Sequence, residues 1–125
     1  MKEVFGKFYE MLKLDREKSS FSKSHSLEDR FAELKLEIEE IGKALENNDT
    51  ENLKEELGDG LWDLLFLIVI AEEKGKFSGK DVIDGAIKKL QRRKPWIFEE
   101  GEIKTKEEEI ELWNENKRKE KEGLI

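Results

Sequence analysis

Apolar residues recur at every third or fourth position along most of the chain, the spacing that places them on one face of an α-helix. In the clearest stretch they are Phe31, Leu34, Ile38, Ile41 and Leu45, a stripe that calls for an antiparallel partner helix. The same period predicts five helices, at residues 2–13, 27–47, 51–75, 79–93 and 106–120. There is no strand signal. We therefore expect an all-α fold, an antiparallel helical bundle of about four to five helices that forms a single domain over residues 1–125.

The segments between the predicted helices carry turn and capping signals. Residues 14–25 are polar and irregular, and they predict a loop. This loop contains Phe21, which is either a core plug or a substrate contact, and His25, which we expect at the surface rather than as a catalytic base. Four capping signals predict where helices begin. They are Ser26 with Asp29, either Asp49 or Thr50 after the break at residues 47–49, Ser78 with Asp81, and Thr105 with Glu108. Helix ends are expected at Gly75 and before Pro95, the only proline.

The predicted helix at 51–75 is apolar on two sides and includes eight consecutive apolar residues, Leu64 to Ala71. A helix of this kind is central in its fold or shared with another subunit, so we expect a homodimer or a higher homo-oligomer. Gly58 and Gly60 each cost roughly 1 kcal/mol relative to alanine inside a helix. Close packing of a partner helix or of a ligand would explain both. The predicted helix at 79–93 is expected to have Val82, Ile83, Ala86, Ile87 and Leu90 inside.

Two pairs of acidic residues precede this apolar run: Glu37 with Glu40, and Glu56 with Asp59. The i, i+3 spacing puts both members of a pair on one helix face. Asp63 extends the second pair by one turn, and no lysine or arginine on the same helix neutralises this stripe. Two carboxylates about 4 Å apart repel each other by roughly 4 kcal/mol at an effective dielectric near 20, a cost that a bound cation would remove. Carboxylate oxygens suit Mg²⁺ or Mn²⁺. The alternative is a solvated acidic face, but the stripe runs directly into the most apolar segment, which favours a metal site.

Basic and aromatic residues gather in the last third of the chain. The predicted helix at 79–93 ends in Lys88, Lys89, Arg92, Arg93 and Lys94, which either complement the helix dipole or bind an anion. After Pro95, residues 96–98 (Trp-Ile-Phe) are expected to fold back as a hydrophobic turn. Trp113 either anchors the last helix or, with Lys117 one turn later, closes over a ligand.

Composition narrows the function. The net charge of −7 argues against sequence-independent nucleic-acid binding as the main task, and eight apolar residues are too few to span a membrane. Without cysteine, disulfides and thiolate metal sites are excluded. The amphipathic N-terminus lacks a signal-peptide core. A cytoplasmic enzyme or binding protein is the expectation.

Three blocks of sequence resemble one known family. They are the acidic signature Glu37-Ile-Glu-Glu40 followed by Glu56-Leu-Gly-Asp59, the segment KLQRRKPWIF at 89–98, and the segment LWNENK at 112–117. In this order and spacing they resemble the MazG-type, all-α nucleoside triphosphate pyrophosphohydrolases. The resemblance implies an antiparallel helical bundle that assembles as dimers or higher oligomers and converts a nucleoside triphosphate and water to the monophosphate and pyrophosphate. A role in nucleotide-pool house-cleaning would follow.

The resemblance also implies roles for individual residues. The magnesium ligands, with Mn²⁺ as a substitute ion, would be Glu37, Glu40, Glu56 and Asp59, which would also be the catalytic carboxylates. The phosphate-side cations would be Lys89 and Arg93, with Trp113 and Lys117 as late contributors to the nucleotide site. Phe21 and Ser26 stand where the family often has a tryptophan and a threonine, and Leu36 stands where it often has a glutamate. Asp63 would be a fifth acidic contact.

Two other functions stay open from the sequence. One is a non-catalytic helical module whose charged patches bind a protein partner. The other is a related pyrophosphohydrolase acting on dUTP or phosphoribosyl-ATP, because relatives with those substrates share the acidic helices. The sequence leaves the base, the sugar and the identity of the general base undetermined.

Overall fold

The computed structural model describes all residues from 1 to 125 and contains six α-helices, one short 3-10 helix and no strand. The helices are α1 (Lys2–Lys18), α2 (Ser20–Ser24), α3 (Leu27–Glu46), α4 (Thr50–Glu73), α5 (Gly79–Arg93) and α6 (Lys106–Lys121), and the 3-10 helix η1 is Pro95–Phe98. The predicted all-α class is confirmed, with six helices rather than four to five. The chain forms two compact units, Met1–Gly79 and Lys80–Ile125.

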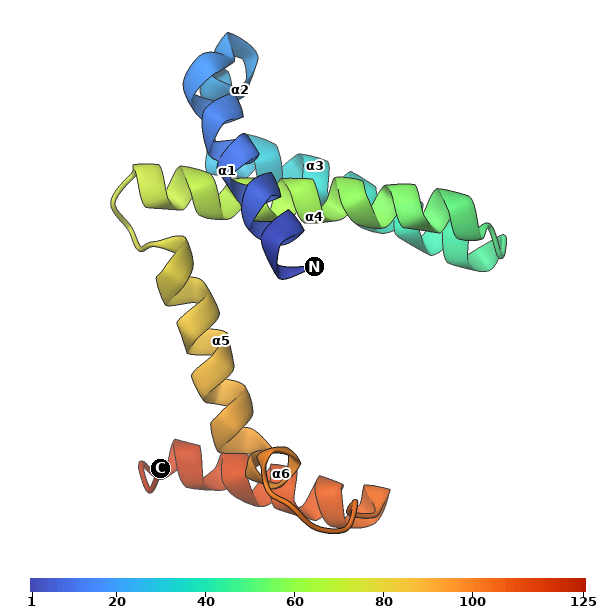
Figure 1. Ribbon diagram of the computed structural model, residues 1–125, viewed down its shortest axis with the longest axis vertical. Coiled ribbons are helices and arrows are strands. Elements are labelled where there is room, and N and C mark those ends of the chain that lie inside the picture. Colours follow the sequence, from blue (N-terminus) through green and yellow to red (C-terminus); the bar gives the residue numbers. More distant parts are fainter. The chain divides into compact units, whose positions relative to one another are not determined.

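Helices α3 and α4 form the frame of the first unit. They are joined by a tight turn at Asn47 and Asn48, where Asn48 has a φ of 52°, and they lie side by side and antiparallel (Figure 1). Asparagine tolerates this left-handed conformation better than most residues. Helix α1 packs against α4 (Figure 1). No helix of the chain is long and apolar enough to cross a membrane.

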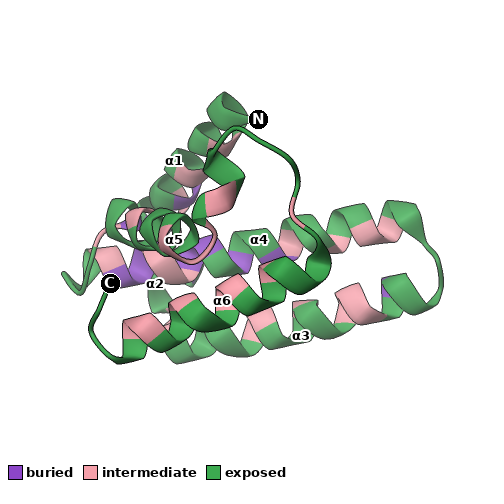
Figure 2. Cartoon of the chain, turned by 90° about the horizontal axis from the view of Figure 1, so that it is seen from below, coloured by how far each residue is buried: buried purple, intermediate pink, exposed green.

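The core of the first unit is centred on the C-terminal half of α4, where Figure 2 shows most of the buried positions. Phe66 and Ile70 are fully buried, and Leu12 of α1 joins Leu65 and Val69 beside them. This agrees with the expectation that the apolar run contains the most buried segment. Burying a side chain of this size contributes about 2 kcal/mol, so these contacts supply much of the stability of the unit.

The predicted loop at 14–25 is wrong, because most of these residues are helical. Helix α1 continues to Lys18, and Ser19 caps the short helix α2 by accepting a hydrogen bond from the Ser22 backbone N–H. The cause is a tertiary contact. The buried guanidinium of Arg16 donates to the carbonyls of Ser22 and His25 and binds Glu73 of α4 at 2.7 Å. Polar composition alone gives no sign of this arrangement.

The helix boundaries follow the predicted caps. Capping boxes are present at Ser26 with Asp29 and at Thr105 with Glu108, as expected, and Asp49 caps α4. Gly75 adopts a φ of +71° just after α4, and the Lys76 N–H closes the helix on the Ala71 carbonyl. Glycine is favoured at this position because a side chain would strain the left-handed backbone.

The second unit is held together at the end of α5. Glu120 of α6 accepts hydrogen bonds from Arg92 and Arg93, and Asn116 donates to the Arg93 carbonyl. Trp96 of η1 donates its ring N–H to Glu109 at 2.9 Å. The expectation that α5 has an interior apolar face is wrong within this chain. Its large apolar side chains are 37–48% exposed, since α6 contacts only the end of α5. Ile97 and Phe98, predicted to tuck back, are likewise exposed.

Candidate active site

Three of the predicted acidic residues meet between α3 and α4. Glu37 comes from α3, and Glu56 and Asp59 come from α4; one oxygen of each carboxylate lies within 4.8 Å of one oxygen of the other two. All three residues are half-buried. We call this group the carboxylate triad. Its oxygens are close enough to bind one ion and exposed enough to be reached from solvent.

Helical geometry and close packing produce the triad. Glu56 and Asp59 share a face of α4 because they are three residues apart. Beside them, the position that a Cβ would take on Gly60 is 3.4 Å from the Ile41 side chain, so α3 packs closely on α4 at that point. The expected packing of a partner helix is therefore confirmed at Gly60. At Gly58, by contrast, a Cβ would meet no atom within 4 Å.

The triad carries an excess of negative charge. A hydrogen bond to Glu56, partial desolvation and the nearby charges of Asp59, Glu56 and Asp63 together raise the pKa of Glu37 to about 7. Glu37 therefore gains or loses its proton near neutral pH, and its protonated form is hydrogen-bonded to Glu56. The oxygen donor set and the excess negative charge both fit a hard divalent cation.

The other two predicted acidic residues have cations of their own. Glu40 lies outside the triad, and its carboxylate binds Lys43 at 3.2 Å, as its position in the sequence suggested. Asp63 is buried and binds Nη1 of Arg30 at 3.1 Å. Burial raises the pKa of Asp63, and the hydrogen bond and charge of Arg30 oppose that rise. No basic residue of α4 itself pairs with Glu56, Asp59 or Asp63, but Arg30 of α3 pairs with Asp63.

A polar network beside the triad was missed by the sequence reasoning. Nη1 of Arg30 also binds Glu33 at 3.1 Å, and the second oxygen of Glu33 lies 3.2 Å from Nε2 of His25. The side chain of His25 is only 12% exposed, so its expected surface position is wrong. One signal was available: Arg30 precedes Glu37 by seven residues, two turns along the same helix face.

Phe21 and Ser26, the two predicted substrate contacts that precede α3, have different surroundings. Phe21 is 71% exposed, which excludes the core-plug alternative, and its ring lies 4.6 Å from that of His25 in an edge-on arrangement. The hydroxyl of Ser26 accepts the Asp29 backbone N–H at 3.0 Å. Ser26 therefore serves the helix cap, whatever else it contacts.

In the second unit, two of the three predicted cations lie around an aromatic ring. Arg93 and Lys117 lie 5.3 Å and 5.9 Å from the centre of the half-buried Trp113 ring, within cation–π distance. Lys94 approaches the same ring at 5.8 Å. A cavity of about 300 Å³ opens here, lined by Lys94, Lys106, Glu109, Ile110 and Trp113. Lys89 is exposed.

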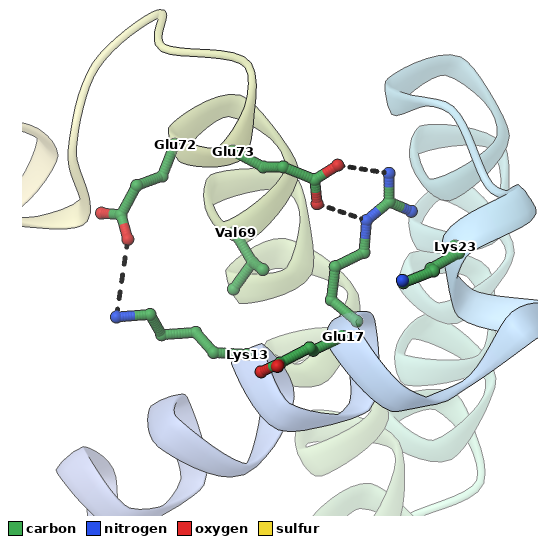
Figure 3. Close-up of a pocket in the computed structure, with 7 residues that line it drawn as sticks. Lys13, Glu17, Lys23, Val69, Glu72 and Glu73 are labelled. Carbon is green, nitrogen blue, oxygen red and sulfur yellow. Dashed lines mark hydrogen bonds and ion pairs between the residues drawn. The ribbon is translucent and has the colours of Figure 1, made fainter.

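A larger cavity of the first unit, about 580 Å³, contains no member of the triad. It lies between α1, α2 and the end of α4 and is lined by Lys13, Arg16, Glu17, Lys23, Val69, Glu72 and Glu73 (Figure 3). Lys13 pairs with Glu72 at 3.6 Å and Arg16 with Glu73 at 2.7 Å. Its positive and negative charges are equal in number and largely paired, so it offers no excess charge for a substrate.

Comparison with known proteins identifies relatives of this arrangement. The family model described as "MazG nucleotide pyrophosphohydrolase domain" matches residues 25–98, which include the triad, Lys89 and Arg93. The chain is similar to a solved structure, the "mazG-related protein from Thermotoga maritima", with a TM-score of 0.85 and 31% identity, covering 90% of this chain and 98% of that one. 

Two curated relatives are much longer than the matched segment. The nucleoside triphosphate pyrophosphohydrolase of Escherichia coli K12 is 31% identical over 68% of this chain and 32% of its own length. The uncharacterized protein YabN of Bacillus subtilis strain 168 is 34% identical over 68% of this chain and 17% of its own length. The match therefore covers less than a third of either relative.

Proposed function

Because the chain belongs to the MazG nucleotide pyrophosphohydrolase family, we propose that it hydrolyses nucleoside or deoxynucleoside triphosphates to the monophosphate and pyrophosphate. The observation that carries this proposal is the carboxylate triad, whose oxygens converge within 4.8 Å and which has no cation of its own. The name of the Escherichia coli relative supports the same reaction. A house-cleaning role in the nucleotide pool is the physiological setting we propose, with a cytoplasmic location.

The residues of the triad fit Mg²⁺, with Mn²⁺ as a substitute. Three carboxylates supply hard oxygen ligands, and the hydrogen bond to Glu56, desolvation and the neighbouring negative charges raise the pKa of Glu37 to about 7. We propose that Glu37, Glu56 and Asp59 hold the ion and that Glu40, one turn from Glu37, joins them after leaving Lys43. When bound, the ion would polarise phosphoryl oxygens and water.

The residues of this chain would handle the proton and the phosphate charge. We propose that one of the glutamates accepts the proton of the attacking water; in the metal-free site the pKa of Glu37 is about 7, near the pH at which a general base works best. Arg93 and the exposed Lys89 are proposed to bind phosphate oxygens, since cations stabilise the charge that develops on a leaving pyrophosphate. Trp113 and Lys117 are proposed to contact the nucleotide.

A homo-oligomer, at least a dimer, is also part of the proposal. On α3, Phe31, Ile38 and Leu45 are 51–58% exposed and seven residues apart, and on α4 Leu57, Trp62 and Leu64 are 44–51% exposed. A seven-residue apolar repeat on a helix surface is typical of a helix–helix interface. A second copy of the chain would cover this surface.

The test is pyrophosphate release from a panel of nucleoside and deoxynucleoside triphosphates, dUTP and phosphoribosyl-ATP, with Mg²⁺ or with EDTA. We expect activity that requires the ion and falls about a hundredfold or more in Glu56→Gln and Asp59→Asn. Glu55→Gln is the matched control, because Glu55 is an exposed neighbour on α4 outside the triad. Pyrophosphate from none of these substrates would refute the proposal and leave the protein-interaction module as the better reading. Preference for dUTP or phosphoribosyl-ATP would assign the chain to those related activities.

A further inference from the structure

We infer that Arg30 is a positioning residue of the carboxylate site, which neutralises Asp63 and keeps it apart from the ion-binding triad. This inference rests on the metal site of the proposed function. The three proposed ligands are all acidic and cannot neutralise Asp63, whereas the basic Arg30 can.

The contacts of Arg30 hold it in one place. Its guanidinium lies over the Phe66 ring at 4.1 Å, and its side chain is 8% exposed. Nη1 binds a carboxylate from each helix of the pair, Glu33 on α3 and Asp63 on α4, at 3.1 Å each. A buried charge is expensive unless it is paired, so the buried Arg30 and Asp63 depend on each other, while Glu33, whose side chain is 40% exposed, adds a second contact.

The two carboxylates that Arg30 binds are neighbours of the triad. Asp63 follows Asp59 by one turn of α4, and Glu33 precedes Glu37 by one turn of α3. Arg30 therefore joins α3 to α4 one turn beyond the triad, at a point that fixes how the two helices align. It also gives Asp63 a partner outside the triad.

This arrangement has a measurable electrostatic consequence. If Asp63 loses its charge, Arg30 keeps only Glu33 as a partner, and the charge about one helical turn from the ion site becomes one unit more positive. Coulomb's law for a unit charge and a divalent ion roughly 6 Å apart in water corresponds to about a tenfold loss of affinity, and screening at physiological salt reduces this to about threefold. Removing Arg30 as well should restore the affinity.

The experiment measures Mn²⁺ binding to the full chain by isothermal titration calorimetry, with MnCl₂ alone and no nucleotide. We expect Asp63→Asn to bind Mn²⁺ about three- to tenfold more weakly than the wild type. The double variant Arg30→Met/Asp63→Asn should return to within about twofold of the wild type, because both charges are gone. Arg30→Lys, which keeps the charge, should also stay within about twofold.

The matched control is Arg16→Met. Arg16 is equally buried and pairs with Glu73 of α4, but Glu73 lies 14 residues beyond Asp59, about 21 Å along the helix. This variant should lower the melting temperature and leave the Mn²⁺ affinity unchanged. A purely structural role for Arg30 would lower stability in the same way without the loss and recovery of affinity.

The outcomes separate the inference from the function it rests on. If the double variant binds as weakly as Asp63→Asn, Asp63 is itself a ligand and the inference is overturned. Unchanged affinity in Asp63→Asn overturns it too. If the wild type binds no Mn²⁺, the metal site fails and the inference fails with it. If the wild type and variants behave as expected but no pyrophosphate is released, the inference stands and the proposed reaction fails.

Discussion

The carboxyl of Glu37 should make the stability of the metal-free protein fall as the pH rises from about 4.5 to 7. Its pKa is about 7 in the folded chain against 4.5 for the ordinary side chain, so the folded state holds the proton more tightly than the unfolded state. Stability changes with pH in proportion to the protons bound unfolded minus those bound folded, and this difference is negative between the two values. The contribution of Glu37 is complete below about pH 4.5 and is lost as the pH rises through 7.

The size of the effect follows from the two pKa values. Moving a pKa from 4.5 to about 7 corresponds to about 3 kcal/mol if the group is fully shielded. Glu37 is only half-buried, so solvent screening reduces the expected loss to about 1–2 kcal/mol. For a chain of this length that is about 3–10 °C in Tm.

The assay is a thermal melt followed by circular dichroism between pH 5 and 7.5 in EDTA, for the wild type and Glu37→Gln. The wild type should lose Tm across this range, and Glu37→Gln should lose much less. Asp63, whose pKa is raised by burial, contributes a slope of the same sign. Carboxyls with lowered pKa, at Asp29, Glu73, Glu108 and Glu120, act in the opposite sense and only below about pH 4.5.

Adding Mg²⁺ should reverse the trend, because the ion competes with the proton. A concentration of a hundred times Kd stabilises by about 2.7 kcal/mol, and the gain in Tm should be larger at pH 7.5 than at pH 5.5. Glu55→Gln, outside the triad, should behave as the wild type. Equal slopes in the wild type and Glu37→Gln would refute the idea that the triad stores this repulsion.

Three further results are expected. Lys117→Ala should raise KM or lower kcat with little change in Tm, while Trp113→Ala should lower Tm; wild-type kinetics in Lys117→Ala would remove this lysine from the site. Light scattering should give a mass of at least twice 14.7 kDa for the wild type. The Ile38→Glu variant should give 14.7 kDa, because its charge would disrupt the exposed apolar stripe. A monomeric wild type would contradict the proposed oligomer. Gly58→Ala should raise the free energy of unfolding by about 0.5–1 kcal/mol in a chemical denaturation curve, because an added Cβ would meet no atom within 4 Å. Gly60→Ala should raise it less, because a side chain of α3 would lie 3.4 Å from the added Cβ. Equal gains would contradict the close packing at Gly60.

Helix positions could be read from the sequence because they depend on local signals. The capping pairs and the 3.6-residue period place the ends of α3, α4, α5 and α6 within two residues of the predicted ones. The polar segment 14–25 could not be read this way. Its helical turns depend on Arg16, which binds Glu73 from 57 residues away in the chain.

The site was partly predictable for the same reason. Spacing alone puts Glu56 and Asp59 on one face, and antiparallel packing of two long helices brings Glu37 to them. Which side of α3 faces α4 depends on side-chain packing, and this excludes Glu40 from the triad while placing Arg30 against Asp63. A contact between residues 33 positions apart leaves no periodic signal in one sequence.

The chain carries two features that cost free energy when it is alone: carboxylates that repel one another, and apolar stripes on α3 and α4 that face solvent. Both belong to the same pair of helices, so their remedies are linked. A divalent ion that joins Glu37 to Glu56 and Asp59 would clamp α3 to α4, and a second copy of the chain would cover the outer surface of that pair. Ion binding should therefore favour assembly, and assembly should favour ion binding, by the same factor, because such coupling is reciprocal. The neutral variant Ile38→Asn tests this link, since a disrupted interface should weaken Mn²⁺ binding although Ile38 provides no ligand atom and the substitution adds no charge beside Glu37. An unchanged Mn²⁺ affinity in a monomeric Ile38→Asn variant would show that the triad is fully formed within one chain.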